Sequence, residues 1–209
     1  LSDILERKGS GYTGRHGDDF LLANNAQFVG FSMELGPAGD LYVLDWHDAD
    51  ICGKEVLNKN TGRIFRIAPN TSLAENFSGR YDDLTKMSDE RLVQLQTSKS
   101  DWHARRARLI LQHRAASGQL QAGTHAQLKK LFNETNNADW RLRAMWALHI
   151  TNGWTVNELN ALLNDKDEYV RAWAIQLLCE DFNPPAEAVS TFTQMAKSDA
   201  SPVVRLYLA

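Results

Sequence analysis

The sequence has no long apolar run and no large excess of charge of one sign. No stretch approaches the roughly 18 to 20 consecutive apolar residues that a membrane-spanning helix needs. The net charge is -3, from 23 Lys and Arg against 26 Asp and Glu, and no cluster of Lys and Arg forms a basic tract. We therefore expect neither a membrane span nor a nucleic-acid partner.

Cysteine is also scarce, and the two cysteines lie far apart in segments of different character. Cys179 lies in an apolar helical pattern and is expected to be buried as a small hydrophobic residue. Cys52 lies in a polar segment, where it could be free, bind a metal or pair with a cysteine elsewhere. A disulfide between the two is not expected, and the redox compartment stays open.

A complete catalytic motif is missing as well. The serines lie in no nucleophile elbow, and the histidines have no ordered partners in the sequence. The glycine-rich residues 9–17 lack the strand, the phosphate-binding glycines and the helix of a nucleotide loop. His149 lies in an apolar helical pattern and is expected to be a core histidine rather than a ligand.

The first part of the sequence, residues 1–68, is rich in strand-forming residues. Short runs of β-branched and aromatic residues alternate with turn formers, which is typical of strands. The GPAGD segment predicts a hairpin over residues 28–46, in which Gly36 and Gly39 supply positive φ and Pro37 presets the turn. The predicted strand runs are FLLANN (20–25), FVGFSMEL (28–35), DLYVLDW (40–46) and GRIFRI (62–67).

From about residue 87 the hydrophobic period becomes helical, and a short motif occurs four times. It reads DWHAR at 101, DWRLR at 139, DEYVR at 167 and SPVVR at 201. Each copy opens with an expected N-cap residue, follows another amphipathic helix and has Arg at its fifth position. Helix pairs at spacings of 38, 28 and 34 residues predict an α-solenoid. The shared slot is occupied by Arg105, Arg143, Arg171 and Arg205.

The arginines of this slot are expected to stack the repeats. Their stems would cover apolar surface while their heads bond an Asp or a carbonyl of the neighbouring repeat. The alternative is a row of anion-binding arginines on the concave surface. The tryptophans are likewise expected to pack between repeats, with a ligand groove as the alternative. They are Trp102, Trp140, Trp146, Trp154 and Trp173, and the residues expected to point inward are Ala104, Leu142, Val170 and Val204.

The DWHDADICG segment is dense in polar groups. Its carboxylates Asp45, Asp48 and Asp50 could form a weak metal site of the calcium type, with His47 and Cys52 beside them. The segment lacks the glycine and the bidentate glutamate of an EF-hand. The alternative is that these side chains cap the loop after a strand by bonding their own backbone.

The β-rich segment resembles a known family. GSGYTGRHGDDFLLANNAQFVGFSMELGPAGDLYVLDWHDADICG, followed by TGRIFRIAP, is similar to the closing part of the β-propeller in large bacterial proteins described as membrane-bound dehydrogenases. In their propeller those proteins resemble soluble quinoprotein sugar dehydrogenases, and they continue into HEAT-like repeats and often a cytochrome c domain. The helical part matches only by order and repeat style. The family's haem motif and earlier blades are absent.

Together, the sequence patterns and the resemblance predict a mixed fold, β then α. Partial β-propeller blades would span residues 1–68, a linker with one short helical turn residues 69–86, and a HEAT-like α-solenoid of about four helix pairs residues 87–209. A hairpin pair cannot bury a core alone, so residues 1–68 are expected to join a larger sheet assembly or to lean on the helices. The start at Leu1 and the end within a helical pattern indicate a fragment.

Two functions are expected from these features. By resemblance, the chain is the C-terminal fragment of an extracytoplasmic sugar or alcohol dehydrogenase, periplasmic or extracellular. The parent chain would then bind pyrroloquinoline quinone and calcium, with no cofactor in this fragment. The alternative is a non-catalytic α-solenoid that binds a protein or glycan on its concave face, with the β segment as a cap. A surface row of aromatic or charged residues on the inner helices would favour the alternative.

Overall fold

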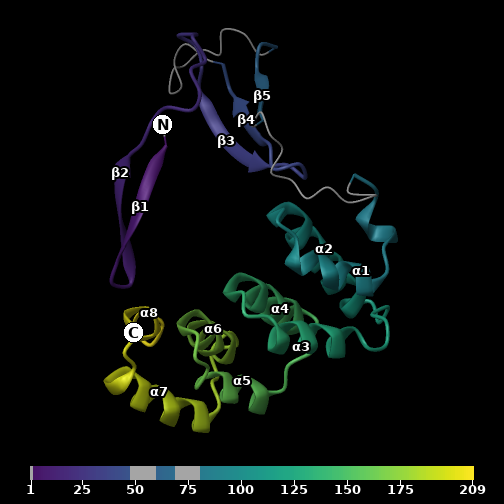
Figure 1. Cartoon of the computed structure of the whole chain (residues 1–209), viewed down its shortest axis with the longest axis vertical. Coiled ribbons are helices and arrows are strands. Elements are labelled where there is room, and N and C mark those ends of the chain that lie inside the picture. The colour runs from purple at the N-terminus through teal and green to yellow at the C-terminus, as the bar shows by residue number, and fades with distance from the viewer. Residues whose placement is uncertain (1, 48–59, 69–80) are drawn as a thin grey trace.

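The computed structural model describes residues 2–47, 60–68 and 81–209, in which two small antiparallel sheets precede a row of helices (Figure 1). The first sheet is a two-stranded hairpin, and the second has the strand order β3-β4-β5. Residues 20–25 were predicted as a strand, and this is wrong because they form none. The strands are β1 (Asp3–Lys8), β2 (Gly11–His16), β3 (Gly30–Leu35), β4 (Leu41–Asp45) and β5 (Arg63–Ile67).

The hairpin predicted over residues 28–46 is confirmed by the pairing of β3 with β4. The N–H of Gly36 donates to the carbonyl of Asp40 at 2.8 Å, and the N–H of Gly39 donates to the carbonyl of Gly36 at 3.1 Å. Gly39 has a φ of +79°, as predicted, whereas Gly36 is not among the positive-φ glycines. A Cβ on Gly36 would lie 2.6 Å from the ring of Tyr42. Glycine is therefore needed at position 36 because the Tyr42 ring approaches closely, and not for its backbone conformation.

The helical part is built from helices that contact each other in pairs. α1 packs on α2, α3 on α4, α5 on α6 and α7 on α8, and α2, α4, α6 and α8 contact each other in succession. Figure 1 shows these even-numbered helices on the inner side of the row, and we call them the inner helices. The helices are α1 (Asp89–Gln94), α2 (Asp101–Ala116), α3 (Thr124–Glu134), α4 (Ala138–Ile150), α5 (Val156–Leu162), α6 (Glu168–Leu178), α7 (Ala186–Ser198) and α8 (Pro202–Tyr207), with 3-10 turns at Leu84–Lys86 and Leu95–Thr97.

The inner helices begin close to the predicted positions. Asp167 and Ser201 cap α6 and α8 as predicted, and their side chains accept hydrogen bonds from the first backbone N–H groups. The predicted caps of α2 and α4 are wrong by one and two positions, because Ser100 and Asn137 occupy those sites. All four residues predicted to point inward are buried: Ala104, Leu142, Val170 and Val204.

The hydrophobic core lies in the helical part. Among the described residues, every buried apolar side chain except Ala38 and Val43 belongs to residues 84–204. Two clusters fill this part, and Trp154 packs against both of them. The helices therefore share a continuous core that does not depend on the strands.

The strands, in contrast, expose their apolar side chains. No residue of β1 or β2 is buried. In the second sheet Met33 lies opposite Val43, and Leu44 lies opposite Ile64 on the other face. Met33, Leu44 and Ile64 are all exposed, so both faces of this sheet present apolar surface. The β part therefore has almost no core of its own.

The β part contacts the helices at two places. At the start of α2, the hydroxyl of Ser100 donates to the carbonyl of Pro37 at 3.1 Å. At α6, Arg7 of β1 donates two hydrogen bonds to the carboxylate of Glu168, at 2.7 and 3.0 Å. Figure 1 shows the β3-β4-β5 sheet next to α2 and the β1–β2 hairpin reaching α6 and α8.

Replacing Arg7 with Ala is expected to release the β1–β2 hairpin from α6. The hairpin buries no side chain. Arg7 pairs with Glu168 and lies 5.8 Å from the ring centre of Tyr169, and a further attachment is a hydrogen bond between Tyr12 and Tyr169. Backbone amides of residues 3–16 should therefore exchange hydrogen faster in Arg7→Ala than in the unchanged protein. Arg15→Ala is the matched control, because Arg15 pairs with Glu6 inside the hairpin. Equal exchange in the two variants would contradict the expectation.

Glu158 at the start of α5 is expected to make stability depend on acid pH. The hydrogen bond from Lys129, and next the N–H of Thr155, lower the pKa of Glu158 from 4.5 to about 2. A lowered folded-state pKa stabilises the fold fully above about pH 4.5, and this contribution is lost as the pH falls towards 2. Between these pH values the unchanged protein takes up a proton at Glu158 when it unfolds. The Glu158→Gln variant should therefore take up about one proton fewer at most.

Urea unfolding at several pH values between these limits measures the slope of stability against pH. Glu187→Gln is the control, because Glu187 is exposed in the first turn of α7. The Glu158 variant should flatten the slope and the control should leave it in place. Equal slopes in both variants would refute the role assigned to Glu158.

Candidate functional site

Asp45, the first residue of the predicted metal site, is buried at the end of β4. Its carboxylate accepts the N–H groups of Val29 at 2.8 Å and His47 at 2.9 Å, and Nε of Arg63 at 2.7 Å. Burial raises the pKa of Asp45, but these hydrogen bonds outweigh burial and hold the pKa below its usual value. Asp45 therefore organises the end of the strand, as the capping alternative expects.

The other residues of the predicted metal site, Asp48 and Asp50, lie outside the described residues, and so does Cys52. In the part of the chain that the structure describes, no group of three or more His, Cys, Asp or Glu is placed to hold a metal ion. His47 has a φ of +53°, and its Nδ1 lies 2.8 Å from the hydroxyl of Thr61. The metal site stays a prediction.

Two arginines of the repeated slot connect neighbouring helix pairs. Arg143 of α4 donates to the carbonyl of Ser98, before α2, at 2.8 Å. Arg171 of α6 donates to both carboxylate oxygens of Asp199, before α8, at 2.9 Å each. The predicted stacking role is therefore confirmed for these two positions.

Arg108, Trp146 and Trp173 form a continuous row across the inner helices. The guanidinium carbon of Arg108, on α2, lies 5.2 Å from the ring centre of Trp146 on α4. Trp146 meets Trp173 of α6 edge to face, with ring centres 5.0 Å apart. All three side chains are half-buried. We call these residues the inner row; their contacts confirm that Trp146 and Trp173 pack between repeats.

The inner row contains two buried donors without an acceptor. Nη1 of Arg108 and Nε1 of Trp146 have no hydrogen-bond partner among the described residues. Burial lowers the pKa of Arg108; Asp101 counteracts this, and Arg143 and Arg105 lower it further. A buried donor without a partner costs about 1–3 kcal/mol. Pairing either donor with a carbonyl or carboxylate oxygen of a ligand would remove that cost, and it requires the side chain to turn outward, because both atoms are enclosed.

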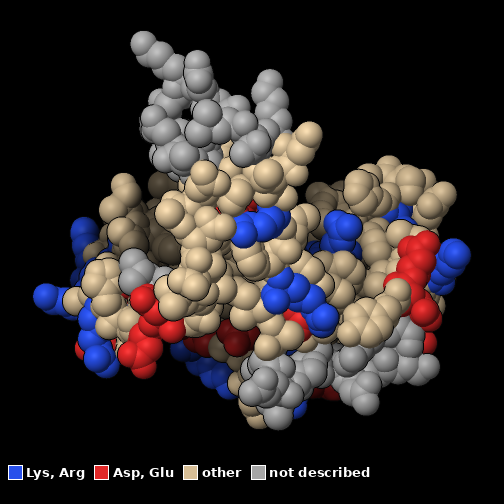
Figure 2. Space-filling model, turned by 90° about the horizontal axis from the view of Figure 1, so that it is seen from above, with Lys and Arg blue, Asp and Glu red and all other residues tan. Residues whose placement is uncertain are grey.

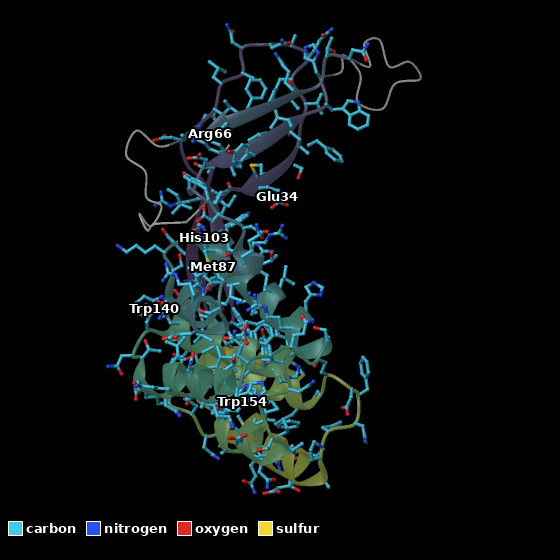
Figure 3. All side chains as sticks on the ribbon, turned by 90° about the vertical axis from the view of Figure 1, so that its right-hand side faces the viewer. Glu34, Arg66, Met87, His103, Trp140 and Trp154 are labelled. Carbon is cyan, nitrogen blue, oxygen red and sulfur yellow. The ribbon has the colours of Figure 1, made fainter. Side chains whose placement is uncertain are left out.

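A groove of about 390 Å³ separates α2 from the edge of the second sheet. Figure 3 places Glu34 on the sheet, facing the helical part that contains His103 of α2. Arg105 of the groove is exposed, and the carboxylate of Asp101 is 3.9 Å away, the nearest among the described residues. The groove is lined by Met33, Glu34 and Leu35 from β3 and by Asp101, Trp102, Arg105, Arg106 and Leu109 from α2.

The surface charges of the described residues are mixed. Figure 2 shows basic and acidic side chains interspersed on the face seen from above, without a broad area of one sign. Nucleic-acid-binding surfaces are instead typically basic along a whole face or stripe. The arginines beside α2 are therefore suited to one or two carboxylates of a ligand more than to a polyanion.

The described chain is thus a mixed protein with two small antiparallel sheets and paired helices, and these residues form no closed barrel or propeller. Comparison of the chain with family models, curated proteins and solved structures finds no match. In the described ranges, no helix has the length and apolar character required to cross a membrane.

Proposed function

We propose that this chain is an interaction scaffold: an α-solenoid of HEAT-like helix pairs whose inner helices bind a partner protein. The observation that carries the proposal is the inner row of Arg108, Trp146 and Trp173. Stacked helix pairs generate an extended binding surface, and Trp and Arg are the side chains that most often dominate binding energy at interfaces. The two buried donors without acceptors support a partner with oxygen acceptors. A glycan is the alternative partner.

Partner capture from extracts of the source organism, quantified by mass spectrometry, tests this proposal. Trp173→Ala should reduce recovery of the partner by about tenfold or more, as expected for an interface hot spot. Trp140→Ala is a matched control, because Trp140 lines a groove with residues of α1 and α3 on the outer side of the row. Far-UV circular dichroism checks that both variants fold. Equal recovery by the two folded variants would overturn the proposal.

We further propose that residues 1–68 belong to a larger sheet assembly, such as the propeller of the membrane-bound dehydrogenase family that they resemble. The supporting observation is the apolar surface on both faces of the second sheet. The chain would then be the C-terminal part of an extracytoplasmic sugar or alcohol dehydrogenase, periplasmic or extracellular. Pyrroloquinoline quinone and calcium would be bound by other parts of that protein, since the carboxylate of Asp45 already accepts three hydrogen bonds.

Dye reduction by the natural protein that contains this chain tests the second proposal. The protein is supplied with pyrroloquinoline quinone and calcium and offered a panel of sugars and polyols. Reduction that requires both quinone and substrate would support a dehydrogenase. The absence of turnover together with the absence of quinone binding would overturn it.

A further inference from the structure

β3 is an edge strand, because among the described residues it pairs with β4 alone. The hydrogen bond from Gly36 N–H to Asp40 shows which β3 residues bond to β4. Hydrogen-bonded and non-hydrogen-bonded positions alternate along an antiparallel pair, so Glu34 turns its backbone groups towards β4. Met33 and Leu35 therefore direct their N–H and C=O groups towards the free edge.

This free edge borders the groove beside α2. Three consecutive β3 residues, Met33, Glu34 and Leu35, line the groove. Consecutive side chains of a strand point to opposite faces, so a groove that contacts all three runs along the edge of the strand. Met33 and Leu35 are 62% and 54% exposed. Unpaired backbone groups thus face open space, as they do where an extended peptide adds a strand to a sheet.

The opposite wall of the groove contains two arginines and the carboxylate of Asp101. Arg106 lies over the ring of Trp102, with its guanidinium carbon 5.7 Å from the ring centre, and makes no ion pair with a carboxylate of the described residues. Arg105 is 68% exposed, and its nearest carboxylate, that of Asp101, also pairs with Arg143 at 3.2 Å. Both guanidinium groups can therefore bind an additional carboxylate.

The charges around the groove favour an acidic ligand. The groove also contains the carboxylate of Glu34, which an acidic ligand would meet on the strand side. The charged groups that line the groove are balanced, with Arg105 and Arg106 against Glu34 and Asp101. Beside the lining, Arg108 interacts electrostatically with Asp101 and Arg105, and Arg143 pairs with Asp101, so the surroundings add positive charge. The residues that set this balance are Arg105, Arg106, Arg108 and Arg143 against Glu34 and Asp101.

We propose that an extended acidic segment of a partner protein adds a strand to β3 in this groove, with its carboxylates against Arg105 and Arg106. The inference rests on the proposed scaffold function and names the kind of partner segment. Backbone hydrogen bonds to Met33 and Leu35 supply affinity, and the guanidinium groups select acidic side chains.

The test titrates the isotope-labelled 209-residue chain with a short peptide that alternates valine and glutamate. A peptide that alternates valine and lysine is the control. The glutamate peptide is expected to slow hydrogen exchange at the amides of Met33 and Leu35. It should also bind about tenfold or more tightly than the lysine peptide, with an advantage that falls as salt is added.

Two sets of variants test separately the backbone hydrogen bonds of the edge and the charge of the arginines. Met33→Pro removes an N–H at the free edge without removing a bond to β4, whereas Met33→Val retains that N–H. Binding should be lost in the first variant and kept in the second. Replacing Arg105 and Arg106 together with Ala should weaken the glutamate peptide by about tenfold or more and leave the lysine peptide unaffected.

Several outcomes would overturn the proposal. Equal affinity for the two peptides would exclude selection of acidic residues, and bound peptide without protection of Met33 and Leu35 would exclude strand addition. Protection without peptide that increases with protein concentration would assign the edge to a second copy of the chain. If the peptide fails to bind while Trp173→Ala still reduces partner capture, this inference fails and the scaffold function stands.

Discussion

Replacing Asp89 with Ala is expected to lower the free energy of unfolding by about 3–5 kcal/mol, because it breaks a buried ion pair. Asp89, the first residue of α1, is 1% exposed and pairs with Arg114 of α2. Its carboxylate also accepts the N–H of Gln121 at 2.7 Å and the hydroxyl of Thr124 at 2.9 Å. Removing it leaves the guanidinium of Arg114 inside the protein with backbone carbonyls as its only acceptors among the described residues.

Thermal unfolding followed by far-UV circular dichroism measures this loss. For a chain of this size the expected fall in Tm is about 6–20 °C. Asp139→Ala is the control, because Asp139 is exposed in the first turn of α4 and its charge is worth at most about 1 kcal/mol there. Similar Tm values for the two variants would show that the buried pair contributes no more than an exposed charge.

The stabilisation that Asp89 provides is expected to be lost in acid. Burial raises its pKa, but hydrogen bonds from Gln121, Arg114 and Thr124 outweigh burial and keep the pKa below its usual value. A lowered folded-state pKa stabilises the fold above the unfolded-state value of about 3.9, and the contribution disappears as the pH falls through the folded value. The destabilising effect of Asp89→Ala should therefore shrink at acid pH.

Replacing Arg108 with Met is expected to stabilise the chain while weakening partner binding by about tenfold or more. The change removes a buried donor without an acceptor, which is worth about 1–3 kcal/mol, and keeps an apolar stem in place. The lost contact of the guanidinium with Trp146 offsets part of this gain, by about 0.5–2 kcal/mol. A net gain of about 1 kcal/mol would raise Tm by about 2–4 °C.

The same melts and the same partner capture measure both effects in one variant. Arg105→Met is the control for stability, because Arg105 is exposed and its replacement should leave Tm within about 2 °C. A fall in Tm for Arg108→Met would show that this arginine stabilises the free chain, which would contradict a destabilising unpaired donor.

In the helical part, the features that depend on one helix alone could be predicted from the sequence. The inward positions and the helix pairs follow from periodicity, which each helix contains within itself. The ion pairs of Asp89 with Arg114 and of Arg141 with Asp165 could not be predicted, because their partners are 25 and 24 residues apart and are brought together by helix packing. The inner row depends on the same packing, so the sequence supplied its tryptophans but not the position of Arg108.

The β part shows a different limit of sequence reasoning. The apolar run at residues 20–25 predicts a strand, yet Phe20 and Leu22 are exposed there. The β1–β2 hairpin was missed, although Gly9 marks its turn with a φ of +63°. A strand exists only where a partner strand reaches it, and the exposed side chains of this hairpin carry no buried alternation to reveal the pairing.

The two attachments of the β part change the mechanics of the helix row. In a row where each helix pair touches only its neighbours, only those neighbour contacts set the curvature. Here the bonds Ser100–Pro37 and Arg7–Glu168 add a second path between α2 and α6. Widening the row would strain these two bonds, so the β part restrains the spacing of α2 and α6 for as long as they hold. A partner at the inner row therefore meets helices that are held from the β side as well as by their neighbours.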